Sequence, residues 1–423
     1  MFDFLTDSYF WLIAIGTGLL GVLNGTIGTF SFLRKESLMG DVIAHSVLPG
    51  VALAYIFFQS KNLLLLLVGG MVFGWLGSFF THYLSEKSKL KTDTTFAIIL
   101  SSFFALGIML LSYIQQHPGP NPSGLNHFLF GNAASISESE VLTICIIAGL
   151  ALLAIFRFFV PLRLICFNPD YAETIGVSKR FYTGLLRFLL ILSIAISLQT
   201  VGVVMAAALL IIPATGARMW THRLNNMVYI AGLMGAIAGL GGTYMSYHFS
   251  KAPTGPWVVI FLSFFAIVSI FFSPTKGVVA NYRKKRRNQF KIDTENTVKR
   301  WWELMEDTSS KLSAEISICN QFGFSTGRWK TILRYLAKQN WIVATSNGGF
   351  ELSVEGKNKA LKIIRLHRLW ELYLAKRLSL PTDHVHNDAE AIEHIITPEI
   401  EAFLERDLDH PQRDPHNSII PQV

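Results

Sequence analysis

The chain has 423 residues, of which 51% are hydrophobic, and its mean hydropathy of +0.39 excludes an ordinary soluble globular protein of this length. Its three cysteines are scattered, which excludes a disulfide framework and a thiolate zinc site. The formal net charge of +8 is too weak a signal to indicate nucleic-acid binding by itself.

The charged residues are unevenly distributed along the chain. The first 289 residues hold ten of the 29 acidic residues, whereas the remaining third holds 19. We therefore expect a transmembrane domain at 1–276 and a basic juxtamembrane linker at 277–290. A soluble part should follow, divided into 291–350 and 351–423.

Nine apolar runs approach the length of about 20 residues that a helix needs to cross a bilayer. They are 10–32, 41–58, 63–84, 95–114, 140–160, 182–198, 201–219, 226–249 and 257–272. The sixth and seventh are short and separated only by Gln199 and Thr200, so one broken or re-entrant element is the alternative. The sequence thus predicts an α-helical polytopic membrane protein with eight or nine transmembrane helices.

Lys and Arg residues concentrate in alternate loops between these runs. Those loops carry Arg34, Lys35, Lys87, Lys89, Lys91, Arg163, Lys179, Arg180, Arg223 and the run from Arg283 to Arg287. The opposite loops carry little beyond Lys61 and Lys251. With nine spans, the positive-inside rule places the N-terminus outside and the soluble part in the cytoplasm.

Asp41 and His45 stand four residues apart in an apolar stretch, 37–50. On a helix this spacing puts both side chains on one face, one turn apart. A carboxylate beside an imidazole suits Mn, Fe or Zn, and ionisable groups in membrane spans are costly and usually functional. The alternative is that Asp41 caps a helix at the water interface and His45 is an ordinary helix residue.

This stretch resembles a signature of the permease subunits of ABC transporters that import manganese, zinc or iron: SLMGDVIAHSVLPGVALAY. Two further runs look like the same family, LFGNAASIS from Leu129 and QTVGVVMAAALLIIPATGARM from Gln199. The resemblance implies a divalent transition metal as the substrate, with Asp41 and His45 in the transport path.

The polar loop 167–177 is helix-like and ends in a glycine. It could be only a connection, but it resembles the coupling helix with which these permeases dock on their ATPase. The resemblance implies that four residues of this loop take part in coupling to the ATPase: Pro169, Ala172, Glu173 and Gly176.

The chain contains no GxxxxGK[ST] run, so it has no nucleotide site of that kind and we do not expect an enzyme. The resemblance implies three partners: an ATPase subunit, an extracytoplasmic solute-binding protein and a second permease subunit, identical or different. It also implies a multi-pass protein of the bacterial cytoplasmic membrane.

The segment from 291 to 350 predicts a winged helix. A Trp-rich helix is followed by a second helix, a break at Gly323, and a third helix that Ser325 would cap. Asn347 and the two glycines after it indicate a hairpin turn. Exposed DNA-facing side chains would be Arg328, Lys330 and Arg334, although a winged helix used for protein contacts is a serious alternative.

Histidines and acidic residues alternate at helical spacing in the last 60 residues. His367 and Glu371 are one turn apart. On a continuous helix, four more side chains would share one face: His386, Glu390, Glu393 and His394. Two such faces without cysteine indicate a metal site.

This region resembles the metal-binding and dimerisation domain of the manganese- or iron-dependent repressors, the diphtheria toxin repressor family. The resemblance lies in HRLWELYL, in DHVHNDAEAIEHIITPEIEAFL and in RDPHNSIIP. It implies Glu393 and His394 as primary ligands, and it implies ligand positions used in differing combinations at His367, Glu371, His386 and Glu390. Glu390 stands where iron-type members have Cys, which favours an oxygen-rich, manganese-type site.

One departure from that family concerns its first helix, which supplies further ligands. Val298 and Trp301 occupy those places here, and neither can bind a metal. Either Glu295 or Glu303 substitutes, or the primary site is incomplete.

Together these patterns predict a metal-importing ABC permease, with Mn²⁺ favoured over Zn²⁺ or Fe²⁺, fused to a cytoplasmic metal-sensing, repressor-like domain. The alternatives for the fused part are a membrane-tethered or proteolytically released metal-dependent transcription repressor, or a structural dimerisation module.

Overall fold

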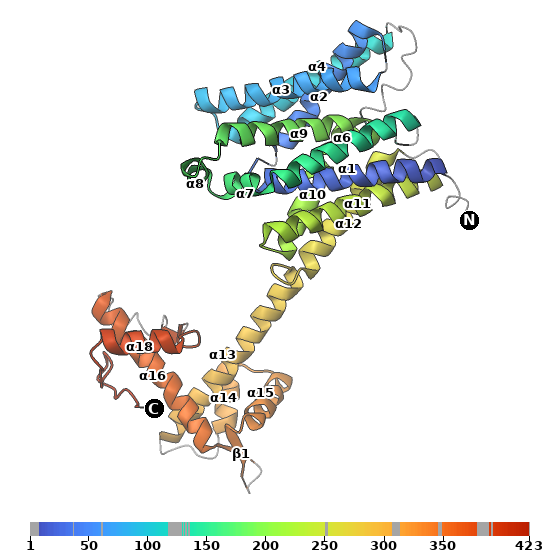
Figure 1. Cartoon of the computed structure of the whole chain (residues 1–423). Coiled ribbons are helices and arrows are strands. Elements are labelled where there is room, and N and C mark those ends of the chain that lie inside the picture. Colours follow the sequence, from blue (N-terminus) through green and yellow to red (C-terminus); the bar gives the residue numbers. More distant parts are fainter. Residues whose placement is uncertain are drawn as a thin grey trace. The chain divides into compact units, whose positions relative to one another are not determined.

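The computed structural model describes residues 8–36, 38–60, 62–116, 129, 131, 133, 136–249, 253–306, 314–345, 349–378, 389–390 and 392–422. The chain forms two compact units, a membrane unit at Met1–Ala280 and a tail unit at Asn281–Val423 (Figure 1). Most of the segment predicted as a linker, 277–290, is helical.

The membrane unit is built from helices that run side by side (Figure 1). They are α1 (Ser8–Leu33), α2 (Met39–Phe58), α3 (Leu63–Lys87), α4 (Thr92–Gln116), α6 (Glu138–Arg157), α7 (Phe159–Phe167), α8 (Pro169–Thr174), α9 (Lys179–Val201), α10 (Val203–Trp220), α11 (Leu224–His248) and α12 (Thr254–Phe272). Within the described ranges, eight are long and apolar enough to cross a membrane, and α10 is a shorter apolar helix. The predicted polytopic fold is confirmed.

The break predicted near residue 200 is a junction between α9 and α10. Gly202 ends α9, with its N–H donating to the carbonyl oxygen of Leu198 at 2.9 Å, and its φ is +86°. Glycine adopts this conformation at little steric cost. The 18 residues of α10 span about 27 Å at 1.5 Å per residue, close to the hydrocarbon thickness of about 30 Å.

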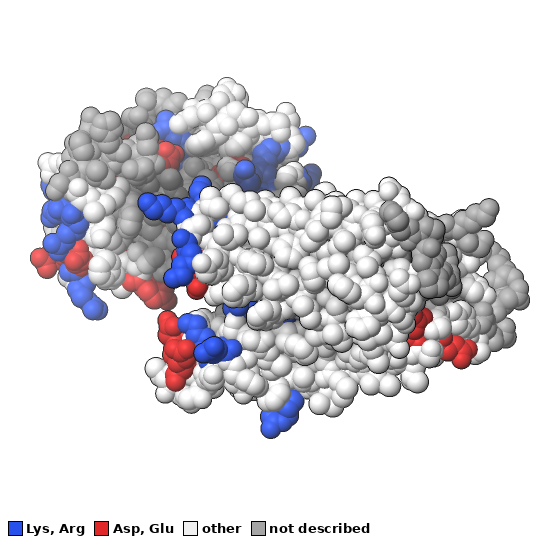
Figure 2. Space-filling model, turned by 90° about the horizontal axis from the view of Figure 1, so that it is seen from above, with Lys and Arg blue, Asp and Glu red and all other residues white. Residues whose placement is uncertain are grey.

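Charged side chains are scarce along the middle of the membrane unit. Figure 2 shows a broad band of its surface without Lys, Arg, Asp or Glu, with charged residues gathered at its two ends. An apolar band of this kind is what a lipid bilayer requires of a spanning surface.

Helices α1 and α11 pack backbone against backbone. A Cβ atom added to Gly21 would lie 2.1 Å from the carbonyl oxygen of Gly235, and one added to Gly25 would lie 2.4 Å from that of Ala231. Small residues four positions apart let membrane helices approach closely, where dispersion contacts replace the hydrophobic effect as the source of attraction. This seam joins α1 to α11, which lie far apart in the sequence.

The tail unit has the helix–helix–hairpin order of a winged helix. Its elements are α13 (Val278–Glu306, which begins just before the division), α14 (Ala314–Phe322), α15 (Thr326–Lys338), β1 (Ile342–Ala344), β2 (Phe350–Leu352), α16 (Val354–Arg377) and α18 (Pro398–Asp407). Ser325 caps α15 as predicted, because its hydroxyl accepts from the N–H of Arg328. Strands β1 and β2 pair antiparallel, and Ile342 lies opposite Leu352. The turn residues Asn347 and Gly348 lie outside the described residues.

Two small cores hold the tail unit together. Val298 and Trp301 of α13 are buried with Ile332 and Leu336 of α15. A second cluster joins α16 to α18 and the segment after it, through Leu369, Leu372, Leu404, Leu408 and Ile420.

Replacing Gly21 by Ala is expected to lower the thermal unfolding midpoint of the detergent-purified chain, because the new methyl group must push two helix backbones apart. Overpacking of this kind typically costs about 1–3 kcal/mol. The matched control is Gly149→Ala in α6, where an added Cβ has no neighbour within 4 Å. Equal midpoints for the two variants would contradict the close packing of α1 on α11.

Candidate functional site

Asp41 and His45 face each other near the start of α2. Their Oδ1 and Nε2 atoms are 3.5 Å apart, and their side chains are 35% and 12% exposed. The His45 ring lies edge-on to Phe104 of α4, with ring centroids 4.8 Å apart. Its Nδ1 atom is buried without a hydrogen-bond partner among the described residues.

The alternative that Asp41 caps the helix does not match this geometry. Leu38 is the N-cap residue of α2, and no side chain makes a capping hydrogen bond there. The Asp41 carboxylate lies in the first turn, where the helix dipole favours a negative charge, and it remains accessible. One oxygen and one nitrogen therefore converge on a partly exposed point that can bind a cation.

The segment predicted as a coupling helix forms α8. Asn168 caps it by accepting from the N–H of Tyr171, Pro169 is its first residue, and Gly176 ends the turn with a φ of +84°. Ala172 is fully buried, which fixes one side of α8 against the unit. The opposite side is open: the Tyr171 and Ile175 side chains are 53% and 50% exposed, and Glu173 is exposed as well.

Glu393 is the centre of a buried ionic cluster in the tail unit. Its Oε2 atom is 2.5 Å from His367 Nδ1, and its two oxygens are 3.1 and 2.9 Å from Lys299 Nζ. The other ring nitrogen of His367, Nε2, is 3.1 Å from Glu371 Oε1. This fully buried carboxylate therefore joins α13 to α16.

His394 extends the cluster toward α13. Its Nδ1 atom is 2.7 Å from Glu295 Oε2, and Glu295 Oε1 accepts from Lys359 Nζ at 2.8 Å. His394 Nε2 is 3.6 Å from Glu393 Oε1, and it is buried without a hydrogen-bond partner in the described part of the chain. The two branches of the cluster thus meet between His394 and Glu393.

The cluster favours the charged forms of Glu393 and Glu295. Burial by itself raises the pKa of Glu393, but the hydrogen bond from His367 and the charge of Lys299 outweigh burial and lower it. Burial also acts to raise the pKa of Glu295, yet the hydrogen bonds from His394 and Lys359 lower it overall. The pKa of His367 is raised, because its hydrogen bonds to Glu371 and Glu393 outweigh burial.

The predicted tail ligands divide into three groups. The structure brings together four of them, His367, Glu371, Glu393 and His394. Glu390 is exposed, and His386 lies outside the described residues. Glu393 and His394 lie in a turn and not in a continuous helix, and the next helix, α18, begins at Pro398.

Two lysines that the sequence reasoning missed take part in this cluster. Lys299 lies one helical turn after Glu295 on α13, and Lys359 comes from α16. Of the two carboxylates weighed as substitutes, Glu295 reaches His394, whereas Glu303 pairs with Arg300 at 2.9 Å. Ammonium groups face the carboxylates, and no three His, Cys, Asp or Glu side chains within the described ranges form a metal-holding group.

The predicted DNA-facing side chains on α15 are not equivalent. Arg328 is half-buried, binds Asp293 at 2.6 and 3.0 Å, and lies over the ring of Phe290. Lys330 and Arg334 are exposed. Arg328 therefore holds α15 against α13, and only the other two are open to a ligand.

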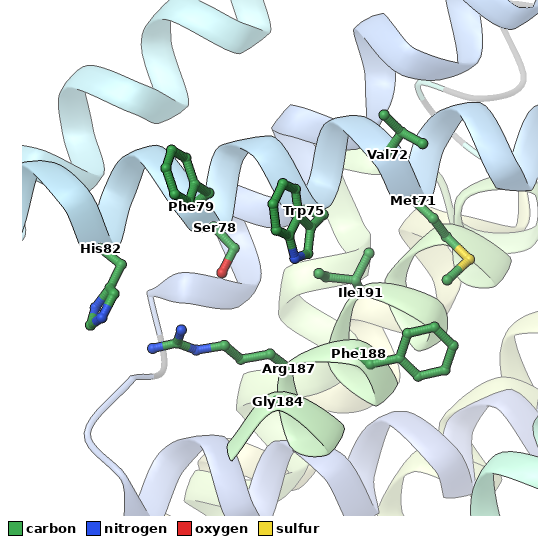
Figure 3. A pocket seen from close by; sticks show the side chains of 10 residues that line it. All are labelled: Met71, Val72, Trp75, Ser78, Phe79, His82, Gly184, Arg187, Phe188 and Ile191. Carbon is green, nitrogen blue, oxygen red and sulfur yellow. The ribbon is translucent and has the colours of Figure 1, made fainter. Parts of the chain in front are cut away.

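A pocket of about 520 Å³ lies between α3 and α9 (Figure 3). The Arg187 side chain of α9 extends toward Ser78 and His82 of α3, and the rest of the lining is mainly apolar and aromatic (Figure 3). None of the predicted site residues lines this pocket, and it contains no carboxylate for a metal ion.

Comparison with known proteins gives two separate matches along the chain. Residues 7–273 match the ABC 3 transport family. Residues 353–422 match a family described as iron dependent repressor, metal binding and dimerisation domain.

Individual relatives agree with the first match. The chain is 36% identical over 370 residues to the manganese transport system membrane protein MntC of Bacillus subtilis, covering 88% of this chain and 85% of the relative. It is 33% identical over 275 residues to the zinc transport system membrane protein TroC of Treponema pallidum, covering 65% of this chain and 92% of the relative.

A solved structure, PsaBC from Streptococcus pneumoniae in complex with Fab, matches with a TM-score of 0.59 and 31% identity. The match covers 67% of this chain and 99% of that one. The chain thus belongs to the ABC 3 transport family. After the membrane helices in the sequence, it carries a metal binding and dimerisation domain of the iron dependent repressor type.

Proposed function

We propose that the chain is the permease subunit of an ABC importer for a divalent transition metal ion, with Mn²⁺ favoured over Zn²⁺ or Fe²⁺. The observation that carries the proposal is the converging pair of Asp41 and His45, 3.5 Å apart and partly exposed, in a chain of this family. Relatives named as manganese and zinc transport proteins support the class of substrate.

Two ligands from one chain hold a transition metal only weakly, and weak ligation suits a transport path because the ion must also be released. A second permease subunit would contribute a second pair, and water would complete the coordination. A solute-binding protein on the outer side delivers the ion, and Asp41 and His45 bind it transiently as access alternates.

The exposed side of α8 is the proposed docking surface for a separate ATPase subunit. Pro169 and Gly176 set the start and end of this short helix, and Ala172 anchors it. The half-exposed Tyr171 and Ile175 then supply apolar contacts beside the charged Glu173. The concentration of Lys and Arg in alternate loops supports a cytoplasmic location for α8 and the tail unit in this proposal.

For the tail unit we propose cytoplasmic metal sensing through His367 and Glu371, with His386 as the further ligand expected from the sequence. Nδ1 of His367 is held by Glu393, and Nε2 is directed at Glu371. A carboxylate on one ring nitrogen is the usual device that orients a metal-binding histidine. Metal bound there would feed back on transport.

A second candidate function is DNA binding by the winged helix, as a membrane-tethered or released repressor. It is favoured by one observation, the exposure of Lys330 and Arg334 on α15. Arg328 contributes to the packing of α15 in this proposal and not to phosphate contacts.

Replacing Asp41 by Asn or His45 by Ala is expected to reduce uptake of radioactive Mn²⁺ into proteoliposomes, reconstituted with the ATPase and the solute-binding protein. Loss of a metal-binding group should lower uptake on the order of tenfold or more. The control is His82→Ala, since His82 and Glu86 form another pair four residues apart, 3.2 Å from each other, in α3. Normal uptake by a double Asp41→Ala, His45→Ala variant would rule out the proposed path.

The double variant Tyr171→Ala, Ile175→Ala should release the ATPase during co-purification, because it removes the exposed apolar contacts of α8. Contacts of this kind are worth roughly 1–2 kcal/mol each, and every 1.4 kcal/mol is a tenfold change in affinity. Leu90→Ala, which alters a side chain 44% exposed between α3 and α4, should have no effect. If both proteins retain the ATPase equally, α8 is not the docking helix.

DNA binding by the detergent-purified chain should weaken in the double variant Lys330→Ala, Arg334→Ala. The slope of log affinity against log salt concentration should also become shallower by about two, one unit for each lost phosphate contact. The charge-matched control replaces Lys376 and Arg406, which are exposed on α16 and α18. Absence of DNA binding by the unaltered chain at about 50 mM salt would exclude this second function.

A further inference from the structure

The two oxygens of the Glu393 carboxylate are already occupied by a cation. Lys299 Nζ lies 3.1 and 2.9 Å from them, and the Lys299 side chain is only 14% exposed. A metal ion held by Glu393 would have to contact the same oxygens. A divalent ion bound there would lie next to the Lys299 ammonium, and the repulsion between two cations in a buried site strongly disfavours this arrangement.

The second carboxylate near His394 is occupied in the same way. Lys359 Nζ lies 2.8 Å from Glu295 Oε1, while the other oxygen of Glu295 holds His394 Nδ1. The carboxylates of Glu295 and Glu393 are thus each matched by one ammonium group within the tail unit. Ionic neutrality is reached there without a divalent ion, which is how a buried charged group remains tolerable.

The geometry of His394 is nevertheless that of a metal-binding histidine. A carboxylate holds its Nδ1 atom, and its Nε2 atom is buried without a hydrogen-bond partner among the residues described, 3.6 Å from Glu393 Oε1. On the first helix, the two positions from which ligands were expected are buried apolar side chains, Val298 and Trp301. The residue directly after Val298 is Lys299.

We infer that the Lys299 ammonium takes the place of a metal ion at Glu393 and His394. The part of the tail unit that joins α13 to α16 through these residues then folds without metal. The residues present therefore do not fit a bound metal at that point. Metal sensing would then depend on His367 and Glu371, and only this assignment rests on the proposed function.

The experiment measures bound Mn²⁺ per chain by elemental analysis after equilibrium dialysis of the full-length protein in detergent. All variants carry Asp41→Ala and His45→Ala, so that ions in the transport path are not counted. Lys299→Met keeps an unbranched side chain, one atom shorter, and removes its charge, whereas Lys299→Arg keeps the charge.

Lys299→Met should bind one additional Mn²⁺ per chain compared with the parent, and adding His394→Ala to it should abolish that gain. Its unfolding midpoint should fall without metal, because Glu393 loses its cation, and should recover when Mn²⁺ is added. The parent protein, which carries only Asp41→Ala and His45→Ala, should bind no such additional ion, and neither should Lys299→Arg.

A second comparison does not require Lys299→Met to fold. His394→Ala in the parent should leave the Mn²⁺ stoichiometry unchanged, and a loss of one ion would overturn the inference. A folded Lys299→Met protein that gains no ion would overturn it as well. If the parent's tail binds no Mn²⁺ and His367→Ala changes nothing, the sensing proposal fails, whereas a gain in Lys299→Met would still support Lys299 as the replacement cation.

Discussion

A charged side chain that leaves water needs a compensating partner, and both units of this protein depend on that requirement. In the membrane unit, charged residues lie at the ends of the helices, and a broad apolar band separates them (Figure 2). Asp41 and His45 are a partly exposed ionisable pair within this setting, close enough to share one cation. In the tail unit, buried carboxylates are each matched by lysine or histidine.

The membrane unit is held together by close helix contacts and by a few buried hydrogen bonds, such as the one between Thr17 of α1 and Thr243 of α11. Glycines on α1 and α11 bring two backbones together, which only small side chains permit. Against this framework α2 carries Asp41 and His45, the pair proposed to bind the ion, and α8 is a short, well-capped helix with exposed apolar side chains. A weak ligand pair on a firm bundle suits an ion that must pass through, because tight coordination would retain it.

The tail unit keeps the fold of a repressor-type domain while changing the chemistry of its centre. Buried Val298 and Trp301 strengthen the core of the winged helix where ligands would otherwise stand. Lys299 and Lys359 then neutralise Glu393 and Glu295 from within the chain. His367 and Glu371 pair with each other at 3.1 Å on the other side of the cluster, where we propose that metal is sensed.

The sequence by itself determined the polytopic helical class, the helix–helix–hairpin order of the tail and the pairing of Asp41 with His45. These features depend on run lengths and on spacings within one helix or hairpin, which are local and regular. Only the tertiary structure decided that Glu295, and not Glu303, meets His394, since the partners are about 100 residues apart in the chain. The same holds for Lys299 on Glu393, because helical periodicity identifies the face of a residue but not the element packed against it.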